Sequence, residues 1–248
     1  ILHNMPNHIF QFKQFTIDQS LCAMKVGTDG VTLGAVAEVE NARRVLDIGC
    51  GTGLLCLMTA QRNQTAEIVG IDIDEDAVRG ATQNCEASKW SRRITIVGKS
   101  LQEFVKTAPS TFDKIITNPP YFEDSLKAPK ASRTLARHTD SLPLSELASS
   151  TSTLLSEDGS LSIILPTDAH EKFEKIAEEY GLYLRKKTLV YPKPGAEVKR
   201  VVGEVVRIKN EECRIKNVDV VELTIETDVR HQYTDDYIRL TREFYLKM

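Results

Sequence analysis

Two adjacent prolines follow an asparagine at the end of an apolar run in the middle of the chain. The run is FDKIIT (112–117), and the motif after it is Asn118-Pro119-Pro120-Tyr121. Because proline has no backbone N–H and restricts the residue before it, regular strand pairing must end here. The side-chain oxygen of Asn118 and the carbonyl of Pro119 remain as two hydrogen-bond acceptors. Two acceptors preset in a stiff turn are suited to hold both hydrogens of a planar amino group.

A glycine-rich loop lies upstream, in VLDIGCGTGLL (45–55). Gly49, Gly51 and Gly53 alternate between a strand-like run and an apolar helix start. Glycines let the backbone turn tightly and approach a ligand closely, and the helix N-terminus favours an electron-rich group. Such a loop alone could bind NAD, a mononucleotide or S-adenosylmethionine. The spacing differs from the Gly-x-Gly-x-x-Gly dinucleotide fingerprint, so it does not require a pyrophosphate cradle.

Two carboxylates accompany this loop. Asp47, inside the strand end, can meet a ligand ammonium group such as that of S-adenosylmethionine. Asp72 ends the next apolar run (67–72), where a carboxylate accepts hydrogen bonds from both hydroxyls of a ribose, and Ile73 adjoins it. Asp74 is expected to cap the next helix. Strand, loop, helix and strand-terminal acid together predict a nucleoside-bearing cofactor.

Short apolar runs and amphipathic stretches alternate along the chain, which predicts an α/β fold with a doubly wound, Rossmann-like parallel sheet. The expected strands are 44–48, 67–72, 94–97, 112–117 and 160–166, and the expected helices between them are 53–62, 74–88, 100–107 and 143–156. A helix at 168–181, β-rich runs at 184–191, 200–208 and 220–226, and helical spacing over 233–246 follow. We expect one structural domain at 41–248, with residues 1–40 as an extension on the active-site edge.

The overall composition is that of an ordinary soluble globular protein. The chain has 248 residues, 41% hydrophobic and 27% charged, with a net charge of −3. No stretch approaches the ~18 apolar residues that cross a bilayer, and the N-terminus lacks a secretion signal. The five scattered cysteines have no metal-ligand spacing, so we expect reduced, mostly buried thiols and no metal. These features favour a cytoplasmic protein without a membrane partner; the oligomeric state is not predicted, and a monomer is assumed.

The glycine loop, the GID at 70–72 and the NPPY motif together resemble class I S-adenosylmethionine-dependent methyltransferases, over roughly residues 10–248. NPPY is the motif of members that methylate planar amino groups. The resemblance implies S-adenosylmethionine as cofactor, S-adenosylhomocysteine as product and residues 118–121 as the catalytic motif. Tyr121 then offers a face on which a base stacks, worth ~1–3 kcal/mol, once the base has left its own stack.

NPPY alone does not separate adenine in DNA or RNA, guanine in ribosomal RNA, and protein glutamine. Glutamine methyltransferases carry a helical domain ahead of the glycine loop, whereas only 44 residues precede Val45 here. A DNA adenine methyltransferase stays open, although no separate target-recognition domain is evident after the motif. An N2-guanine methyltransferase of ribosomal RNA stays open as an alternative, as does an RNA-binding protein on a methyltransferase scaffold.

The flanking segments resemble a narrower group, the bacterial tRNA1(Val) adenosine-37 N6-methyltransferases. The similar segments are 15–37, 121–144, 201–208 and 233–246. This resemblance implies methyl transfer to the N6 amino group of adenosine 37 in tRNA(Val). It also implies that Gly27 and Thr28, together with Asn118, contact the cofactor. Many class I members place an acid after the third strand, near the cofactor's adenine, where this chain has Ser100; its hydroxyl can still make one hydrogen bond.

A basic run supports an RNA partner, because KAPKASRTLARH (127–138) contains no acid and follows NPPY directly. Phosphate contacts of this kind position a substrate without reading its sequence, and an anticodon loop offers unstacked bases. A second basic run, at 185–209, extends the expected footprint. The predicted RNA contacts are Lys25, Lys127, Lys130, Arg133, Arg137, Lys199 and Arg200. His138 is expected to be a structural hydrogen-bonder more than a catalytic base.

Overall fold

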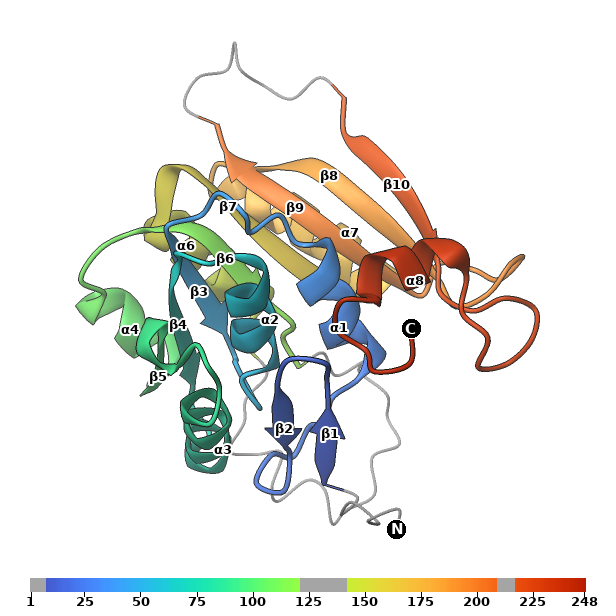
Figure 1. Ribbon diagram of the computed structural model, residues 1–248. Coiled ribbons are helices and arrows are strands. Elements are labelled where there is room, and N and C mark those ends of the chain that lie inside the picture. Colours follow the sequence, from blue (N-terminus) through green and yellow to red (C-terminus); the bar gives the residue numbers. More distant parts are fainter. Residues whose placement is uncertain (1–7, 121–141, 209–216) are drawn as a thin grey trace, which may run out of the picture.

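An eight-stranded sheet forms the centre of the computed structural model, which describes residues 8–120, 142–208 and 217–248 (Figure 1). The strand order is β10-β8-β9-β7-β6-β3-β4-β5. The strands are β3 (Arg44–Ile48), β4 (Glu67–Asp72), β5 (Ile94–Gly98), β6 (Phe112–Thr117), β7 (Leu155–Leu165), β8 (Leu182–Tyr191), β9 (Arg200–Arg207) and β10 (Asp219–Thr224). Every neighbouring pair is parallel except those of β9, which runs antiparallel to β7 and β8.

The chain reverses direction across the sheet at β3. It first adds β4 and β5 on one side and then returns to place β6 and β7 on the other. In a doubly wound sheet, ligands bind in the crevice outside the carboxyl ends of the strands at such a switch point. The residues that follow β3 and β6 therefore meet at the expected binding edge.

Helices cover both faces of the sheet (Figure 1). One face packs on α1 (Thr28–Val36), α2 (Leu54–Arg62) and α3 (Glu75–Glu86); the other packs on α4 (Leu101–Thr107), α6 (Leu144–Leu154) and α7 (Thr167–Glu179). A 3-10 turn, η1 (Ser91–Arg93), precedes β5. The strands are apolar on both sides because both faces are buried: Val45 belongs to the first core, and Leu46 and Ile48 belong to the second.

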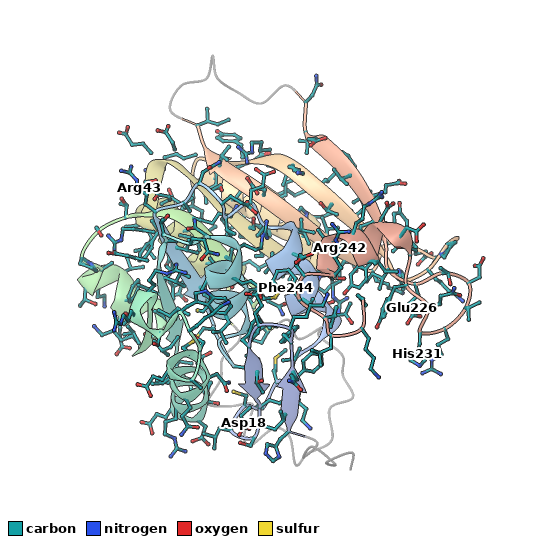
Figure 2. All side chains as sticks on the ribbon, viewed as in Figure 1. Asp18, Arg43, Glu226, His231, Arg242 and Phe244 are labelled. Atoms are coloured by element: carbon teal, nitrogen blue, oxygen red, sulfur yellow. The ribbon has the colours of Figure 1, made fainter. Side chains whose placement is uncertain are left out.

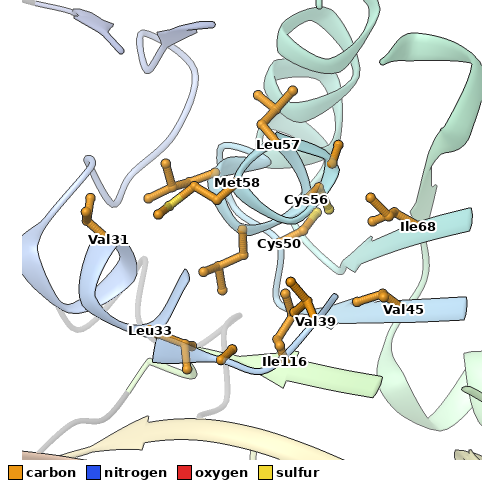
Figure 3. Packing of buried hydrophobic residues seen from close by; sticks show 14 of the residues in the cluster. Val31, Leu33, Val39, Val45, Cys50, Cys56, Leu57, Met58, Ile68 and Ile116 are labelled. Carbon is orange, nitrogen blue, oxygen red and sulfur yellow. The ribbon is translucent and has the colours of Figure 1, made fainter. Parts of the chain in front are cut away.

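The first core brings α1 close to α2 (Figure 3). Val31 and Leu33 of α1 and Met58 of α2 are fully buried. A Cβ at Gly34 would lie 2.6 Å from the sulfur of Met58, closer than real Cβ contacts allow. The small residue thus lets the two helices approach, and it fixes α1 against the body of the sheet.

The two ends of the described chain pack against each other. A hairpin of β1 (Ile9–Gln11) and β2 (Thr16–Asp18) meets the segment after α8 (Asp235–Thr241). The amide of Lys13 donates to the carbonyl of Phe244 at 2.8 Å, and the ring of Phe244 is buried in the first core (Figure 2). The predicted helical stretch at 233–246 is shorter than expected, because the chain leaves the helix to make these contacts.

The doubly wound α/β fold predicted from the sequence is confirmed. The antiparallel placement of β9 between β7 and β8 was not predicted, because a strand buried on both faces has the same apolar pattern in either direction. None of the described helices has the length and apolar character needed to cross a membrane. Cys22, Cys50, Cys56 and Cys85 are free and buried, as predicted, while Cys213 lies outside the described residues.

Candidate active site

The loop at residues 49–53 joins β3 to α2 at the carboxyl edge of the sheet. Its three glycines have φ values of 71°, 53° and 78°, which residues with a Cβ rarely adopt. A Cβ at Gly49 or Gly51 would meet nothing within 4 Å, so both positions face open space. The amides of Gly49 and Cys50 each donate to the carbonyl of Ile71 at 2.9 Å. The loop is held from the side of β4, and its outer surface is free to approach a ligand.

The carboxylate of Asp72, the last residue of β4, lies beside this loop. One oxygen accepts the amide of Gly51 at 2.9 Å, and the other accepts the amide of Asp74 at 3.0 Å. Asp74 caps α3 by accepting the amide of Asp76 at 2.8 Å, as predicted. A carboxylate oxygen has lone pairs beyond one such bond, and Ile73 next to it is 63% exposed. A half-buried acceptor beside an exposed apolar side chain suits a ribose with its attached base.

Asp47 is placed more deeply than the other predicted cofactor contacts. Its exposed fraction is 0%, and its Oδ2 accepts a hydrogen bond from the Cys56 thiol at 3.3 Å. Its Oδ1 is buried without a hydrogen-bond partner in the described part of the chain. Burial raises the pKa of Asp47 to about 7, and the negative charge of Asp72 adds to the effect. A cation arriving nearby would reverse this shift.

Asn118 follows β6 at the same edge. The hydroxyl of Thr117 donates to the carbonyl of Ile48 at 2.8 Å, which ties the end of β6 to the end of β3. The start of α1 closes on Asn118 from another direction. A Cβ at Gly30 would lie 3.9 Å from the Asn118 amide nitrogen and 3.0 Å from a methyl group of Leu54. The asparagine, the glycine loop and the first turns of α1 and α2 therefore share one site.

The segment before α1 lies at this edge as well. The amide of Val26 donates to the buried side chain of Gln19 at 2.8 Å, which anchors the segment to the residues after β2. Lys25, Gly27 and Thr28 are exposed, and Gly27 is the N-cap of α1 without a side-chain cap. These exposed residues directly precede the turn that contacts Asn118.

Comparisons with known proteins identify the family. A family model described as "Methyltransferase small domain" matches residues 27–180. A protein of Phocaeicola vulgatus, named tRNA1(Val) (adenine(37)-N6)-methyltransferase, is 49% identical over 98% of this chain and 100% of its own length. A protein of the same name from Trichodesmium erythraeum is 40% identical over the same shares. The chain belongs to the tRNA1(Val) (adenine(37)-N6)-methyltransferase family.

A solved structure supports the fold of this methyltransferase family member. A predicted O-methyltransferase from Agrobacterium tumefaciens superposes with a TM-score of 0.63, covering 87% of this chain and 96% of that one. At 17% sequence identity, the likeness concerns the fold alone. It extends beyond the region matched by the family model and therefore covers most of the sheet.

Ser100 has a structural role in this methyltransferase. It is the N-cap of α4, and its hydroxyl accepts the amide of Glu103 at 3.2 Å and donates to the Glu103 carboxylate at 2.9 Å. The Glu103 carboxylate in turn accepts the amide of Ser100 at 3.0 Å, which completes a capping box. The Ser-x-x-Glu spacing could have predicted this role. Contact of Ser100 with the cofactor stays a prediction.

Several predicted residues lie outside the described part of the chain. They are Tyr121 and His138 together with the predicted RNA contacts Lys127, Lys130, Arg133 and Arg137. Lys199 and Arg200 are described at the start of β9, beside the carboxyl end of β7, because Leu165 pairs with Val201. Within the described residues, no cluster of histidine, cysteine, aspartate and glutamate side chains could hold a metal ion.

The sequence did not reveal two members of the site. Gly30 belongs to none of the motifs singled out from the sequence, and nothing in the sequence connects the Cys56 thiol with Asp47. The spacing of nine residues between Asp47 and Cys56 crosses a loop, so no helical or strand period signals the contact. Only the return of α2 over β3 brings the two together.

Proposed function

We propose that this chain transfers a methyl group from S-adenosylmethionine to the N6 amino group of adenosine 37 in tRNA(Val). The observation that carries the proposal is the position of Asn118. It follows β6 at the switch point of the sheet, next to the glycine loop after β3. The substrate comes from the shared name of relatives that are 40–49% identical over nearly the whole chain.

The residues at this edge fit S-adenosylmethionine. Gly49 and Gly51 face open space, Asp72 offers acceptors for the ribose hydroxyls, and exposed Ile73 adjoins them. The Oδ1 of Asp47, which has no partner in the described part of the chain, suits the positive charge of the methionine amino group. When bound, the sulfonium supplies an electrophilic methyl group.

Asn118 and Pro119 orient the nucleophile in this proposal. The adenine amino nitrogen is a poor nucleophile because its lone pair is delocalised into the ring. The Asn118 side-chain oxygen and the Pro119 carbonyl can accept its two hydrogens and turn the lone pair away from the ring plane. Tyr121 provides the stacking face for the flipped base.

The tRNA backbone is expected to follow the basic residues around this edge. Lys25 and Lys199 are exposed beside the active site, and the run at 127–138 follows the catalytic motif directly. Each lysine or arginine that neutralises a phosphate makes the affinity for RNA more sensitive to salt. The anticodon loop presents unstacked bases to such a surface.

The test is methyl transfer from tritiated S-adenosylmethionine to an unmodified tRNA(Val) transcript, followed by digestion and identification of the labelled nucleoside. We expect N6-methyladenosine, no label on a transcript with guanosine at position 37, and a loss of at least about 100-fold in rate for Asn118→Ala. Label in N2-methylguanosine would replace the substrate assignment. Full activity of Asn118→Ala would refute the proposed mechanism.

A further inference from the structure

An ion pair joins the start of β9 to the start of α1. The Nε of Arg200 donates to Oδ2 of Asp29 at 2.7 Å. The side chains are 36% and 39% exposed, so the pair is partly shielded from water. The Nη1 of Arg200 also donates to the carbonyl of Lys199 at 2.9 Å, which holds the guanidinium against its own strand.

Asp29 lies in the first turn of α1, where a negative charge also favours the helix dipole. The next residue, Gly30, is the one that approaches Asn118. The preceding residues, Gly27 and Thr28, form the exposed segment assigned to the cofactor. The carboxylate of Asp29 therefore lies between two parts of the active site, and its ion pair ties both to β9.

The sheet provides a rigid support for this contact. Arg200 begins a strand that is paired on both sides, with β7 and with β8. The loop before it is held by a hydrogen bond from the Thr167 hydroxyl to the Val198 carbonyl at 3.0 Å. Helix α1 packs on β7, β9 and α2 (Figure 1), and its first turn brings Gly30 close to Leu54 and Asn118.

Sequence reasoning predicted Arg200 as an RNA contact. A phosphate-binding arginine presents free N–H donors in a fork. Here two of the nitrogens are already bonded to Asp29 and Lys199, and the positive charge is balanced by a carboxylate. The remaining N–H donors of Arg200 would meet a phosphate with a charge that Asp29 already balances, which weakens the attraction.

Resting on the proposed function, we propose that Asp29 and Arg200 are positioning residues of the methyl transfer. The pair fixes the first turn of α1, so that Gly30 supports the Asn118 amide and the 27–28 segment keeps its place at the cofactor. Neither residue needs to touch the substrate. A loosened pair disturbs two parts of the site together.

Asp29→Asn separates this role from phosphate binding, because it removes the carboxylate and leaves the Arg200 charge free. We expect Asp29→Asn, Arg200→Gln and Arg200→Lys each to lower kcat roughly 10-fold, with KM for tRNA changed less than about 2-fold. The double variant Asp29→Asn/Arg200→Gln should lose the same factor of about 10 and not about 100, since both changes break one interaction. S-adenosylhomocysteine should bind roughly threefold more weakly to all of them in calorimetry.

Matched controls exclude a general loss of structure. Asp236→Asn and Arg239→Gln break a pair of the same residue types on the exposed side of α8 and should leave kcat unchanged. The melting temperature of the Asp29 and Arg200 variants should fall by no more than about 2–4 °C, since an exposed pair contributes at most about 1 kcal/mol.

Opposite behaviour of the Asp29 and Arg200 variants would overturn the inference. If Arg200 binds phosphate, Asp29→Asn binds tRNA more tightly, Arg200→Lys is near wild type, and Arg200→Gln lowers the salt slope of tRNA binding by about 1. Additive losses in the double variant would equally refute a shared role.

The calorimetric comparison of S-adenosylhomocysteine binding does not depend on which nucleoside is methylated. An unexpected label in the wild-type assay would therefore change the proposed substrate without deciding the role of the pair.

Discussion

Two buried carboxylates, Asp47 and Glu204, have opposite surroundings. Glu204 of β9 is paired: the buried Lys114 donates to it at 3.0 Å, the Ser162 hydroxyl donates to it at 3.3 Å, and Arg185 completes the group. Asp47 of β3 has only a thiol, and one of its oxygens has no described partner. Buried polar groups are normally satisfied, and an unsatisfied oxygen at the edge that carries the glycine loop fits a ligand at that edge.

The difference between the two carboxylates follows the direction of the strands, from their amino to their carboxyl ends. Lys114 lies near the start of β6, whereas Asn118 follows the end of the same strand. The amino half of the sheet carries a closed ion network, which serves the fold. The carboxyl edge carries glycines that face open space and a carboxylate with one oxygen lacking a partner in the described part of the chain, and we propose that these serve cofactor binding. In the proposed mechanism, β6 contributes structure at one end, through Lys114, and chemistry at the other, through Asn118.

Breaking the Lys114–Glu204 ion pair should have the largest effect on stability. Lys114→Met leaves Glu204 buried without its ammonium partner, and we expect a loss of about 3–5 kcal/mol in the free energy of unfolding. Urea denaturation measures it. The double variant Lys114→Met/Glu204→Gln also removes the buried carboxylate charge, which the half-exposed Arg185 alone would otherwise balance, and should recover at least half of that loss. Equal instability of both variants would mean that Lys114 contributes by packing and not by its charge.

Replacing Asp47, whose buried carboxylate has no charged partner in the described part of the chain, should increase stability, in contrast to the loss expected for Lys114→Met. The pKa of Asp47 is raised from 3.8 to about 7 on folding, so the native state holds a proton that the unfolded state has lost between these values. The contribution of Asp47 to the free energy of unfolding is therefore fully present below about pH 4 and is lost as the pH rises through 7. Asp47→Asn should therefore match wild type near pH 4 and exceed it by up to about 4 kcal/mol at pH 8. Urea denaturation at both values measures the difference, and a pH-independent difference would contradict the assignment.

Binding of S-adenosylhomocysteine should change the ionisation of Asp47 and not that of Glu204. If the amino group of S-adenosylhomocysteine lies near Asp47, binding favours the ionised carboxylate and releases a proton below pH 7. Affinity should rise about tenfold from pH 6 to pH 8, and this dependence should vanish in Asp47→Asn. Calorimetry in two buffers of different ionisation enthalpy counts the released protons. Binding without proton release at pH 6 would place the amino group elsewhere.

The sequence predicted which strand ends meet at one edge of the sheet better than it predicted the contacts between distant residues. The glycine loop, Asp72 and Asn118 could be found because each follows an apolar run whose period marks a strand. The bonds of Asp29 to Arg200 and of Lys114 to Glu204 could not, since they join residues separated by 171 and 90 positions. Such contacts depend on the strand order, and the antiparallel insertion of β9 leaves no signal in the apolar pattern.

The smallest expected effect on stability and binding concerns Ser100, for which both a structural role and a cofactor contact are predicted. The resemblance to class I methyltransferases predicts a cofactor contact, whereas the capping box indicates a role in the start of α4. Ser100→Ala removes the cap and should cost about 1 kcal/mol in the free energy of unfolding. If the hydroxyl serves only the helix, affinity for S-adenosylhomocysteine will stay within about twofold of wild type. A twofold change corresponds to less than about 0.5 kcal/mol, at ~1.4 kcal/mol per tenfold.

Ser100→Asp keeps a capping side chain and restores the acid common in class I members, so it is the matched control. Tighter binding by Ser100→Asp with unchanged stability would show that this position faces the cofactor. Equal affinity in all three proteins would assign Ser100 to the fold alone.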